Sequence, residues 1–325
     1  MNRQTLSDMA ILSFASVWVA YTARREYFRL FLFQLPYLAF PIRVAVPRLA
    51  NEKYLWRKMF DHNPLFITAS DKIAAKEWVE TLGLDIKMPK TLWVGTDAGE
   101  IPAHVWKEKM YLKGAHGFRM NIPVLDAPDD VAEITERANA FLTVEHGKRR
   151  REWAYKGVPR RLIAERAIQG HSGLIEIKCF TYGPVVEQFL VLRRGPPETG
   201  ARWERMEDGG FELSKRATTT SSEIDTSPLP DVTAEAIETA SQIGAHFDHV
   251  RVDFLTDGKI LYLGEITVYH DAGRAYRQGH YESAPANRSW DLRRSWFLTH
   301  PQAGWKQRYA EALNRALDKR AARQR

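Results

Sequence analysis

The sequence of 325 residues is poor in cysteine, since Cys179 is the only one. A single cysteine cannot form a disulfide within the chain, and it cannot supply the several thiolates of a cysteine-rich zinc site. A chain without a disulfide framework is typical of a reducing compartment. We therefore expect a cytoplasmic protein whose fold depends on a packed core.

The sequence also lacks a hydrophobic run long enough to cross a bilayer, which takes ~20 apolar residues. Residues 9–23 carry no charge, but the run is too short, and no small-residue cleavage site follows it. We therefore do not expect a signal peptide. Residues 28–47 are apolar and aromatic but are interrupted by Arg29 and Pro36. Two alternatives stay open for residues 9–47: a helix packed on the body of the protein, or an interfacial helix at the inner face of the membrane.

Acidic residues are fewer than basic ones, with 40 Asp and Glu against 47 Lys and Arg, which gives a net charge of +7. This balance suits an anionic substrate, although a solvated basic face explains it at least as well. The basic cluster at 148–151 is not accompanied by an aromatic-and-basic recognition motif. We therefore expect no nucleic-acid partner.

Periodicity predicts helices and short strands in mixed order. Apolar residues at helical spacing predict helices within 51–82, 128–142, 232–247 and 305–317. Short β-prone runs predict strands at 91–95, 109–113, 121–125, 161–165, 173–180 and 185–193. Residues 195–231 are rich in Pro, Gly, Ser and Thr, which predicts a long loop or a poorly ordered excursion. Because the helices are interspersed with hairpins, we expect an α+β fold.

Two carboxylates lie on a predicted hairpin at 250–268, whose turn contains Asp257 and Gly258. In a regular hairpin Asp253 pairs near Tyr262, and Glu265 falls just beyond it, so both side chains can face one cleft. Such a pair suits Mg²⁺, because a hard cation prefers oxygen ligands. Surface carboxylates at strand ends are equally common.

Arg251 precedes Asp253 by two residues and shares its face of the strand. An arginine there can pair with a carboxylate or hold a transferred phosphate.

Two lysines are candidates for phosphate binding. Lys113 ends a predicted strand and is followed by a turn that contains Gly114, His116 and Gly117. Glycine turns let backbone N–H groups approach phosphate, and a lysine adds a point charge. Lys178 lies on an apolar strand, where a solvent-facing lysine is equally common. A lone histidine such as His116 is more often structural.

Several ordered motifs resemble those of the TupA-like ATP-grasp family, which is named for teichuronopeptide biosynthesis. They are the segment 51–64, Ser70-Asp-Lys, Leu112-Lys-x-x-His-Gly, Glu152-Trp-Ala-Tyr-Lys, Ile175-Glu-Ile-Lys-Cys-Phe, Val250-Arg-Val-Asp-Phe and Gly264-Glu-Ile-Thr. The similarity covers about residues 51–275.

The resemblance implies an ATP-grasp fold in which two α+β lobes enclose an ATP cleft. The expected domains are an apolar helical extension at 1–50, an N-terminal region at 51–105, a small lobe with a phosphate lid at 106–168, and a large lobe at 169–325. ATP and Mg²⁺ are the implied cofactors. The implied nucleotide contacts are Lys113, His116, Gly117 and Lys178, with a hinge beside adenine from Glu165 to Ile168. The implied metal ligands are Asp253, Glu265 and Thr267, and the implied catalytic residues are Arg251 and Lys113.

The implied activity is an ATP-dependent carboxylate–amine ligase that acts through an acyl-phosphate. It would add an amino acid to a cell-surface polysaccharide or its precursor, with an anionic small molecule or saccharide as acceptor and an amine as second substrate. Two alternatives stay open: a phosphotransferase on a sugar-type acceptor, and a non-catalytic member of a polysaccharide assembly complex. We expect Asp253→Ala and Glu265→Ala each to abolish turnover and leave the fold largely intact.

The sequence departs from the family pattern in two places. The turn continues with Phe118-Arg119 where the family usually has Ser-Gly. After Glu265-Ile-Thr, where the family tends to Pro and Gly, this chain has Tyr269-His270-Asp271. The second departure falls where the resemblance places the acceptor site, which leaves room for an acceptor other than that of the family pattern.

Overall fold

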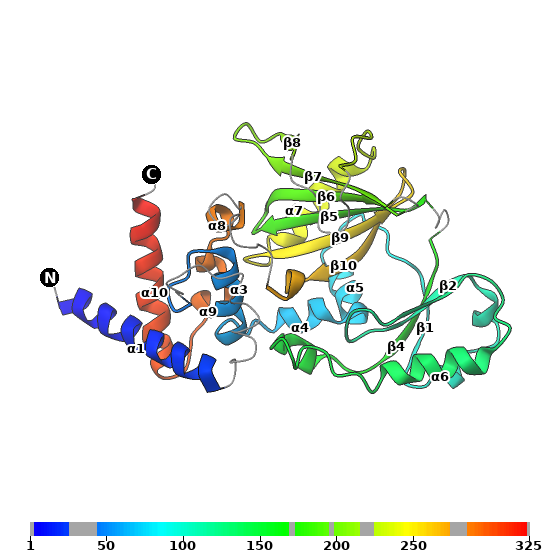
Figure 1. The fold of residues 1–325 in the computed structure, drawn as a ribbon, viewed down its shortest axis with the longest axis horizontal. Helices are drawn as coiled ribbons and strands as arrows, with labels where there is room; N and C mark the ends of the chain where they lie inside the picture. The colour runs from blue at the N-terminus through cyan, green and yellow to red at the C-terminus, as the bar shows by residue number, and fades with distance from the viewer. Residues whose placement is uncertain are drawn as a thin grey trace.

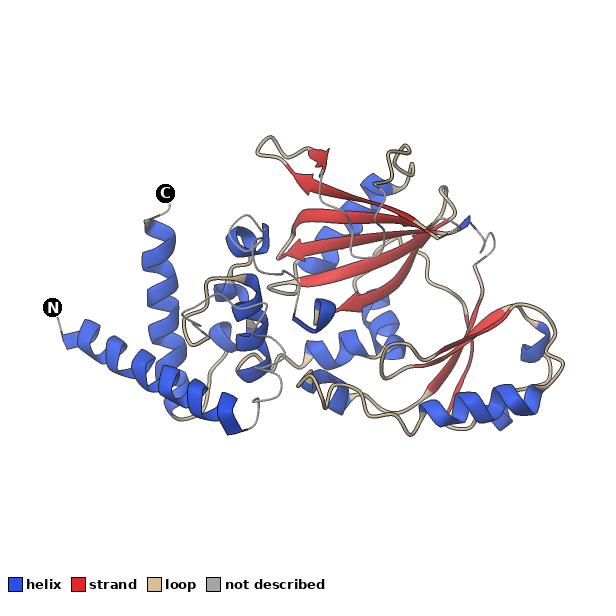
Figure 2. Cartoon of the chain, in the orientation of Figure 1, coloured by secondary structure: helices blue, strands red, loops and turns tan. Residues whose placement is uncertain are grey.

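A computed structural model describes residues 3–25, 44–168, 173–194, 198–214, 224–273 and 285–323. Two antiparallel sheets and a group of helices at the chain termini make up this part of the chain (Figure 1). Helices and strands are mixed throughout, as Figure 2 shows, and the expected α+β class is confirmed.

The smaller sheet has four strands in the order β1-β4-β2-β3. They are β1 (Thr91–Gly95), β2 (Met110–Gly114), β3 (Asn121–Val124) and β4 (Leu162–Arg166). Helix α6 (Val131–Phe141) lies alongside this sheet, and its first turn is capped by the Asp130 side chain, which accepts a hydrogen bond from the Glu133 N–H. Ile122, Ala138 and Ala164 are buried between helix and sheet.

The larger sheet has six strands in the order β10-β9-β5-β6-β7-β8. They are β5 (Ile175–Tyr182), β6 (Val185–Arg193), β7 (Thr199–Arg205), β8 (Phe211–Leu213), β9 (Val250–Thr256) and β10 (Leu261–Thr267). Helix α7 (Thr233–Gly244) packs on one face, where Ile243 meets Val252 and Phe254 in the core. Because side chains alternate along a strand, Arg251 and Asp253 point to the opposite face.

Two short helices, α4 (Leu65–Ser70) and α5 (Lys72–Thr81), lie between the two sheets (Figure 1). The Asp71 side chain caps α5 by accepting a hydrogen bond from the Ile73 N–H, and it also pairs with Arg161 at 2.7 Å. This cap fixes the start of α5, and so the position of Lys72, against the smaller sheet.

The helices near the termini form a third group. They are α1 (Arg3–Arg25), α3 (Ala50–Met59), α8 (Pro285–Ser289), α9 (Trp296–Thr299) and α10 (Trp305–Ala322). Figure 1 shows α1 against α10 at the far side from the smaller sheet. Arg315 on α10 pairs with Asp8 at 2.8 Å, and the Trp56 indole N–H donates to the Tyr309 hydroxyl. Short 3₁₀ helices complete the described elements: η2 (Ala98–Glu100), η3 (Val105–Lys107), η4 (Trp153–Gly157), η6 (His270–Gly273) and η7 (Leu292–Arg294).

The prediction for residues 195–231 is wrong at 199–205 and 211–213, where β7 and β8 extend the larger sheet, and residues 195–197 and 215–223 lie outside the described residues. None of the described helices is long and apolar enough to cross a membrane. Residues 26–43, which hold most of the apolar stretch 28–47, lie outside the described residues. The division into four domains stays a prediction.

Candidate functional site

The hairpin of β9 and β10 places two carboxylates directly opposite each other. Leu263 pairs with Phe254, the register then shifts at Gly264, and Glu265 pairs with Asp253. The predicted regular register, in which Asp253 pairs near Tyr262, is therefore wrong by three residues. Tyr262 lies opposite Leu255, which accounts for two of them, and the bulge at Gly264 adds the third. A Cβ atom at position 264 would lie 3.0 Å from the Asp253 carbonyl oxygen, so glycine suits this close approach.

Asp253 is buried between two cations. Its Oδ1 and Oδ2 accept from Arg251 Nε and Nη2, each at 2.6 Å, and Oδ2 also accepts from Lys178 Nζ at 3.0 Å. Burial alone would raise the pKa of the carboxyl, but Arg251 and Lys178 outweigh it and lower the pKa of Asp253 to about 2. Asp253 is therefore ionised at neutral pH.

Arg251 connects Asp253 to the rest of the hairpin face. Its Nη2 donates to Thr267 Oγ1 at 3.2 Å and approaches Glu265 Oε1 at 3.4 Å, and its Nη1 contacts His270 Nδ1 at 2.7 Å. Burial, and then the Arg251 charge, hold the pKa of His270 well below its usual value. The imidazole is therefore neutral, and its Nδ1 accepts from the guanidinium.

The donors on this face fit a hard divalent cation. Glu265 and Asp253 supply carboxylate oxygens, and Thr267 supplies a hydroxyl that donates to Glu265 Oε1 at 3.1 Å. The Asp253 side chain is 10% exposed, whereas that of Glu265 is 46% exposed. No group of three or more His, Cys, Asp or Glu side chains that could hold a metal occurs in the described part of the chain. Glu265 is thus the accessible ligand of the predicted set.

The smaller sheet presents a second charged group toward the larger one. Lys113 Nζ on β2 donates to Glu165 Oε2 on β4 at 2.6 Å, and Lys76 of α5 pairs with the other oxygen of Glu165. Burial raises the pKa of Glu165, but the two lysines outweigh it and lower the pKa. On the facing sheet Lys178 also pairs with Glu176 at 2.7 Å.

A hollow of about 370 Å³, here termed the inter-sheet hollow, lies between these two charged groups. Its lining includes Lys113 and Glu165 from the smaller sheet, and Glu176, Lys178, Asp253 and Leu255 from the larger one. Of the predicted hinge from Glu165 to Ile168, Glu165 lines this hollow and Ile168 does not, and the contact of the hinge with adenine stays a prediction.

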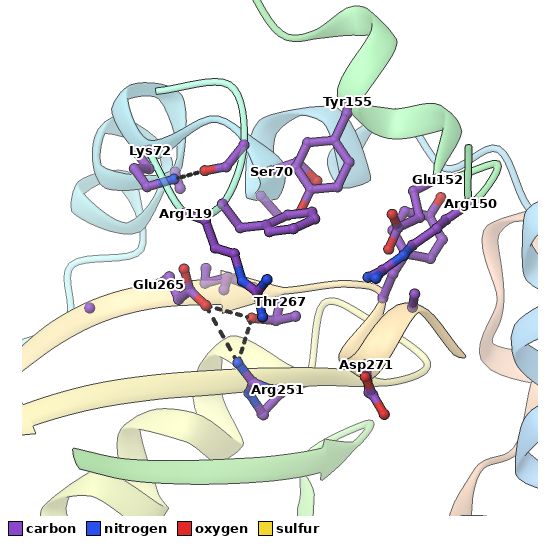
Figure 3. Close-up of a pocket in the computed structure, with 18 of the residues that line it drawn as sticks. Ser70, Lys72, Arg119, Arg150, Glu152, Tyr155, Arg251, Glu265, Thr267 and Asp271 are labelled. Atoms are coloured by element: carbon purple, nitrogen blue, oxygen red, sulfur yellow. Dashed lines mark hydrogen bonds and ion pairs between the residues drawn. The ribbon is translucent and has the colours of Figure 1, made fainter. Parts of the chain in front are cut away.

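A second hollow of about 280 Å³, here termed the hairpin hollow, lies beyond Glu265 (Figure 3). Its lining includes Arg119, Arg150, Tyr155, Arg251, Thr267 and Asp271. The two hollows share Lys72, Gly117, Phe118, Arg119, Gly264 and Glu265, which together are termed the neck.

The turn after Lys113 forms one side of the neck. Lys72 Nζ donates to the Gly117 carbonyl oxygen, and burial lowers the pKa of Lys72. A Cβ atom at position 117 would lie 2.1 Å from the His146 ring, which explains the glycine. His116 is buried and lies on the far side of the turn, in a third hollow of about 320 Å³ that it shares with His146. The structure therefore separates His116 from the other predicted phosphate contacts.

Residues with strained backbone conformations are concentrated around the hairpin hollow. The four described non-glycine residues with positive φ are Arg119 (59°), Arg151 (54°), Asp271 (44°) and Ala272 (55°). Three of them line this hollow, and Arg151 lies between Arg150 and Glu152, which both line it. Such residues cost roughly 1–3 kcal/mol each and tend to cluster at functional sites.

The comparison with protein families matches residues 52–282 to the family described as TupA-like ATP-grasp. The chain belongs to this family. The resemblance expected from the sequence motifs is confirmed, and with it the ATP-grasp fold.

The similarity of this ATP-grasp chain to solved structures is distant. A D-alanine–D-alanine ligase from Bacillus anthracis complexed with ATP is 15% identical, with a TM-score of 0.39 over 78% of this chain and 68% of the other. The D-alanine–D-alanine ligase from Helicobacter pylori is 12% identical, with a TM-score of 0.43 over 74% and 69%. The ligase PsnB, complexed with a variant of its minimal precursor, Mg and ADP, is 14% identical, with a TM-score of 0.36 over 78% and 60%. A comparison with curated proteins found no match.

The sequence motifs did not identify every charged residue that lines the two hollows of this ATP-grasp chain. Lys72 appeared only as the end of the motif Ser70-Asp-Lys, and Arg119 only as a departure from the family pattern. Arg150 appeared only as part of a basic cluster. Local sequence gives no signal for Arg150, because the fold alone brings it to the hairpin hollow.

Proposed function

We propose that this protein is an ATP-dependent carboxylate–amine ligase that binds ATP in the inter-sheet hollow and activates its carboxylate substrate at the neck. The observation that carries the proposal is the pair of lysines, Lys113 and Lys178, which approach one hollow from facing sheets. The carboxylates of Asp253 and Glu265 line the same hollow. Point charges on opposite sides suit a polyphosphate chain. Membership of the ATP-grasp family supports the same assignment.

In this proposal Lys113, Lys178 and Gly117 contact the phosphates of ATP. Lys113 and Lys178 are engaged with Glu165, Glu176 and Asp253 in the structure, and these contacts hold the two lysines at the edge of the hollow. A phosphate oxygen can replace a carboxylate oxygen as their partner, because both are anionic acceptors.

In this proposal Asp253, Glu265 and Thr267 would hold Mg²⁺. Asp253 lines the inter-sheet hollow, Thr267 lines the hairpin hollow, and Glu265 lies at the neck between them. The ion would neutralise phosphate charge. Arg251 keeps Asp253 ionised and donates a hydrogen bond to Thr267. In this proposal it is the catalytic group that would stabilise the developing charge of the transferred phosphate.

The proposed reaction has two steps. A carboxylate oxygen of the acceptor attacks the γ-phosphorus of ATP, the bond to the β-phosphate oxygen breaks, and ADP leaves. The amine nitrogen then attacks the acyl carbon, a C–N bond forms, and the C–O bond to phosphate breaks as phosphate and one proton are released. Positioning and charge neutralisation supply most of the acceleration in such chemistry.

The acceptor in this proposal is a cell-surface polysaccharide or its precursor, and the amine is an amino acid. The support for this part is that the family is named for teichuronopeptide biosynthesis, together with the excess of basic over acidic residues in this chain. A basic protein attracts anionic substrates at long range.

The proposal also includes contact between α1 and the surface of an anionic membrane. The five most exposed large apolar side chains of the described residues lie on α1, at 49–68% exposure: Leu6, Met9, Phe14, Val17 and Tyr21. Arg3 and Arg25 flank them at the two ends of the helix. Apolar residues flanked by arginines favour a helix that lies in the plane of an anionic lipid surface.

The activity is tested by calorimetry of Mg-ATP binding and by product analysis. We expect binding that needs Mg²⁺ and, with a carboxylate and an amino acid present, equal amounts of ADP, phosphate and a new amide. Absence of nucleotide binding in the wild-type protein would reject the proposal. A phosphorylated acceptor without phosphate release would identify a phosphotransferase instead.

A further inference from the structure

Arg119 and Arg150 enter the hairpin hollow from different parts of the chain. Figure 3 shows Arg119 reaching from the turn toward Glu265 and Thr267, while Arg150 points into the same cavity from the other side. Among the described residues neither guanidinium forms an ion pair or a hydrogen bond. Two such groups in one small cavity leave several N–H donors without a protein acceptor.

The other cations of the hairpin hollow are engaged. Lys76 pairs with Glu165, Arg251 pairs with Asp253, and Lys72 donates to the Gly117 carbonyl. The acidic residues Glu152, Glu265 and Asp271 also line the hollow, so its lining carries five cationic and three anionic side chains. The lining therefore has two more cationic than anionic side chains, and Arg119 and Arg150 are the two cations that form no hydrogen bond or ion pair among the described residues.

Arg150 is held in place rather than loosely exposed. Its guanidinium lies 5.9 Å from the centre of the Phe118 ring, and its backbone carbonyl accepts a hydrogen bond from Lys58 Nζ at 3.0 Å. Lys58 is itself buried, and it also donates to the Ala272 carbonyl at 2.8 Å. Through these two hydrogen bonds, Lys58 connects the segment that contains Arg150 to the strained segment that contains Ala272.

The backbone around the hairpin hollow is also strained. Arg119 itself, Arg151 beside Arg150, and the pair Asp271 and Ala272 have positive φ. Non-glycine residues keep such strained conformations only where the surrounding structure holds them in place. Residues of this kind cluster at ligand-binding sites. This observation is independent of the charges and points to the same cavity.

We infer that the hairpin hollow binds an acceptor with two anionic groups, the carboxylate that is activated beside Arg119 at the neck and a second anionic group that pairs with Arg150. The inference rests on the proposed function, since it assigns the acceptor to the hollow next to the nucleotide. A guanidinium binds carboxylate or phosphate with paired hydrogen bonds, so the second group is a carboxylate or a phosphate. A cavity of about 280 Å³ suits one small acceptor unit.

The test compares acceptors in matched pairs. Calorimetry with Mg²⁺ and a non-hydrolysable ATP analogue measures the binding of butyrate against glutarate, and of glucuronate against glucuronate 1-phosphate. We expect the member with two anionic groups to bind at least tenfold more tightly in at least one pair. The pair that shows the preference identifies the second group as carboxylate or phosphate.

Arg150→Gln should remove this preference. We expect at least a tenfold loss of affinity for the preferred compound and less than a twofold change for its singly charged partner. Arg149→Gln is the matched control, because Arg149 is the exposed neighbour in the same cluster, and it should change neither value. Thermal unfolding of both variants checks that the fold is retained.

The outcomes separate the two proposals. If the wild-type protein binds the ATP analogue but shows no preference for two charges, or if Arg150→Gln keeps the preference, the inference is overturned and the ligase proposal stands. If the wild-type protein does not bind the nucleotide, the ligase proposal itself fails.

Discussion

Glu265 lies directly opposite Asp253 across β10 and β9, although an unbroken register from Leu263 and Phe254 would put Gly264 there. The bulge at Gly264 turns the Glu265 side chain to the face that carries Arg251 and Asp253. The two carboxylates nevertheless differ. Asp253 is enclosed by cations, while Glu265 is open to both hollows. The structure therefore predicts different results for the same substitution at the two positions.

Asp253→Ala should destabilise the fold. The substitution leaves Arg251 and Lys178 buried without their shared carboxylate, and breaking a buried ion pair costs about 3–5 kcal/mol. This expectation replaces the sequence-based one that the fold stays largely intact. Chemical denaturation measures the loss, and a change below about 1 kcal/mol would contradict it.

Glu265→Ala should abolish turnover while the free energy of unfolding changes by less than about 1 kcal/mol. The side chain is 46% exposed, so its removal leaves no closely packed cavity. Steady-state kinetics and denaturation are measured together, with Glu212→Ala on the exposed edge strand β8 as control. Near-normal activity in Glu265→Ala would remove this residue from the proposed metal site.

The stability of the wild-type protein should fall in acid partly through Asp253. Its pKa is about 2 in the folded state against 3.8 for a free aspartate, so the unfolded state binds the proton first. The contribution of Asp253 is thus complete above pH ~4 and is lost as the pH falls toward 2, and it amounts to roughly 2 kcal/mol. Denaturation of Asp253→Asn as a function of pH should show a shallower decline over that interval, and an identical slope would contradict the assignment.

Lys113→Ala should weaken Mg-ATP binding about tenfold or more, because a charge-assisted contact with phosphate contributes roughly 1.5–3 kcal/mol. Glu165 keeps Lys76 as a partner in this variant, so the smaller sheet should remain folded. Lys109→Ala is the matched control, since Lys109 is exposed just before the same strand. Equal affinity for both variants would exclude Lys113 from the phosphate site.

Arg119→Gly should separate stability from activity. Glycine adopts the φ of 59° without strain, so the fold should be as stable as wild type or more stable by about 1 kcal/mol. Loss of the guanidinium at the neck should lower turnover at least tenfold. Melting temperature and kinetics are measured on one preparation, and full activity in the variant would show that Arg119 has no part in the reaction.

Val17→Glu should prevent the proposed contact of α1 with membranes. Val17 is 68% exposed at the middle of the apolar face, where a carboxylate is repelled by anionic lipid. Co-sedimentation with phosphatidylglycerol-containing vesicles compares wild type, Val17→Glu and the control Val131→Glu, which changes an exposed valine of α6. Absence of wild-type binding would reject the membrane contact.

The sequence by itself determined the family, the α+β class and the order of most elements, because motifs and hydrophobic periodicity are local properties that survive without coordinates. It also brought Arg251, Asp253, Glu265 and Thr267 to one hairpin, since turn chemistry at Asp257 and Gly258 fixes which strands pair. It missed β7 and β8 because strands rich in polar residues and glycine lack a clear alternation.

Only the tertiary structure decided how these residues are arranged. The bulge at Gly264 depends on close approach to the Asp253 backbone, and the separation of His116 from Lys113 depends on how the turn packs on His146. Arg119 and Arg150 line one hollow, although no local sequence pattern relates the two segments from which they come. Such contacts arise from long-range packing, which fixes side-chain direction and burial after the elements have formed.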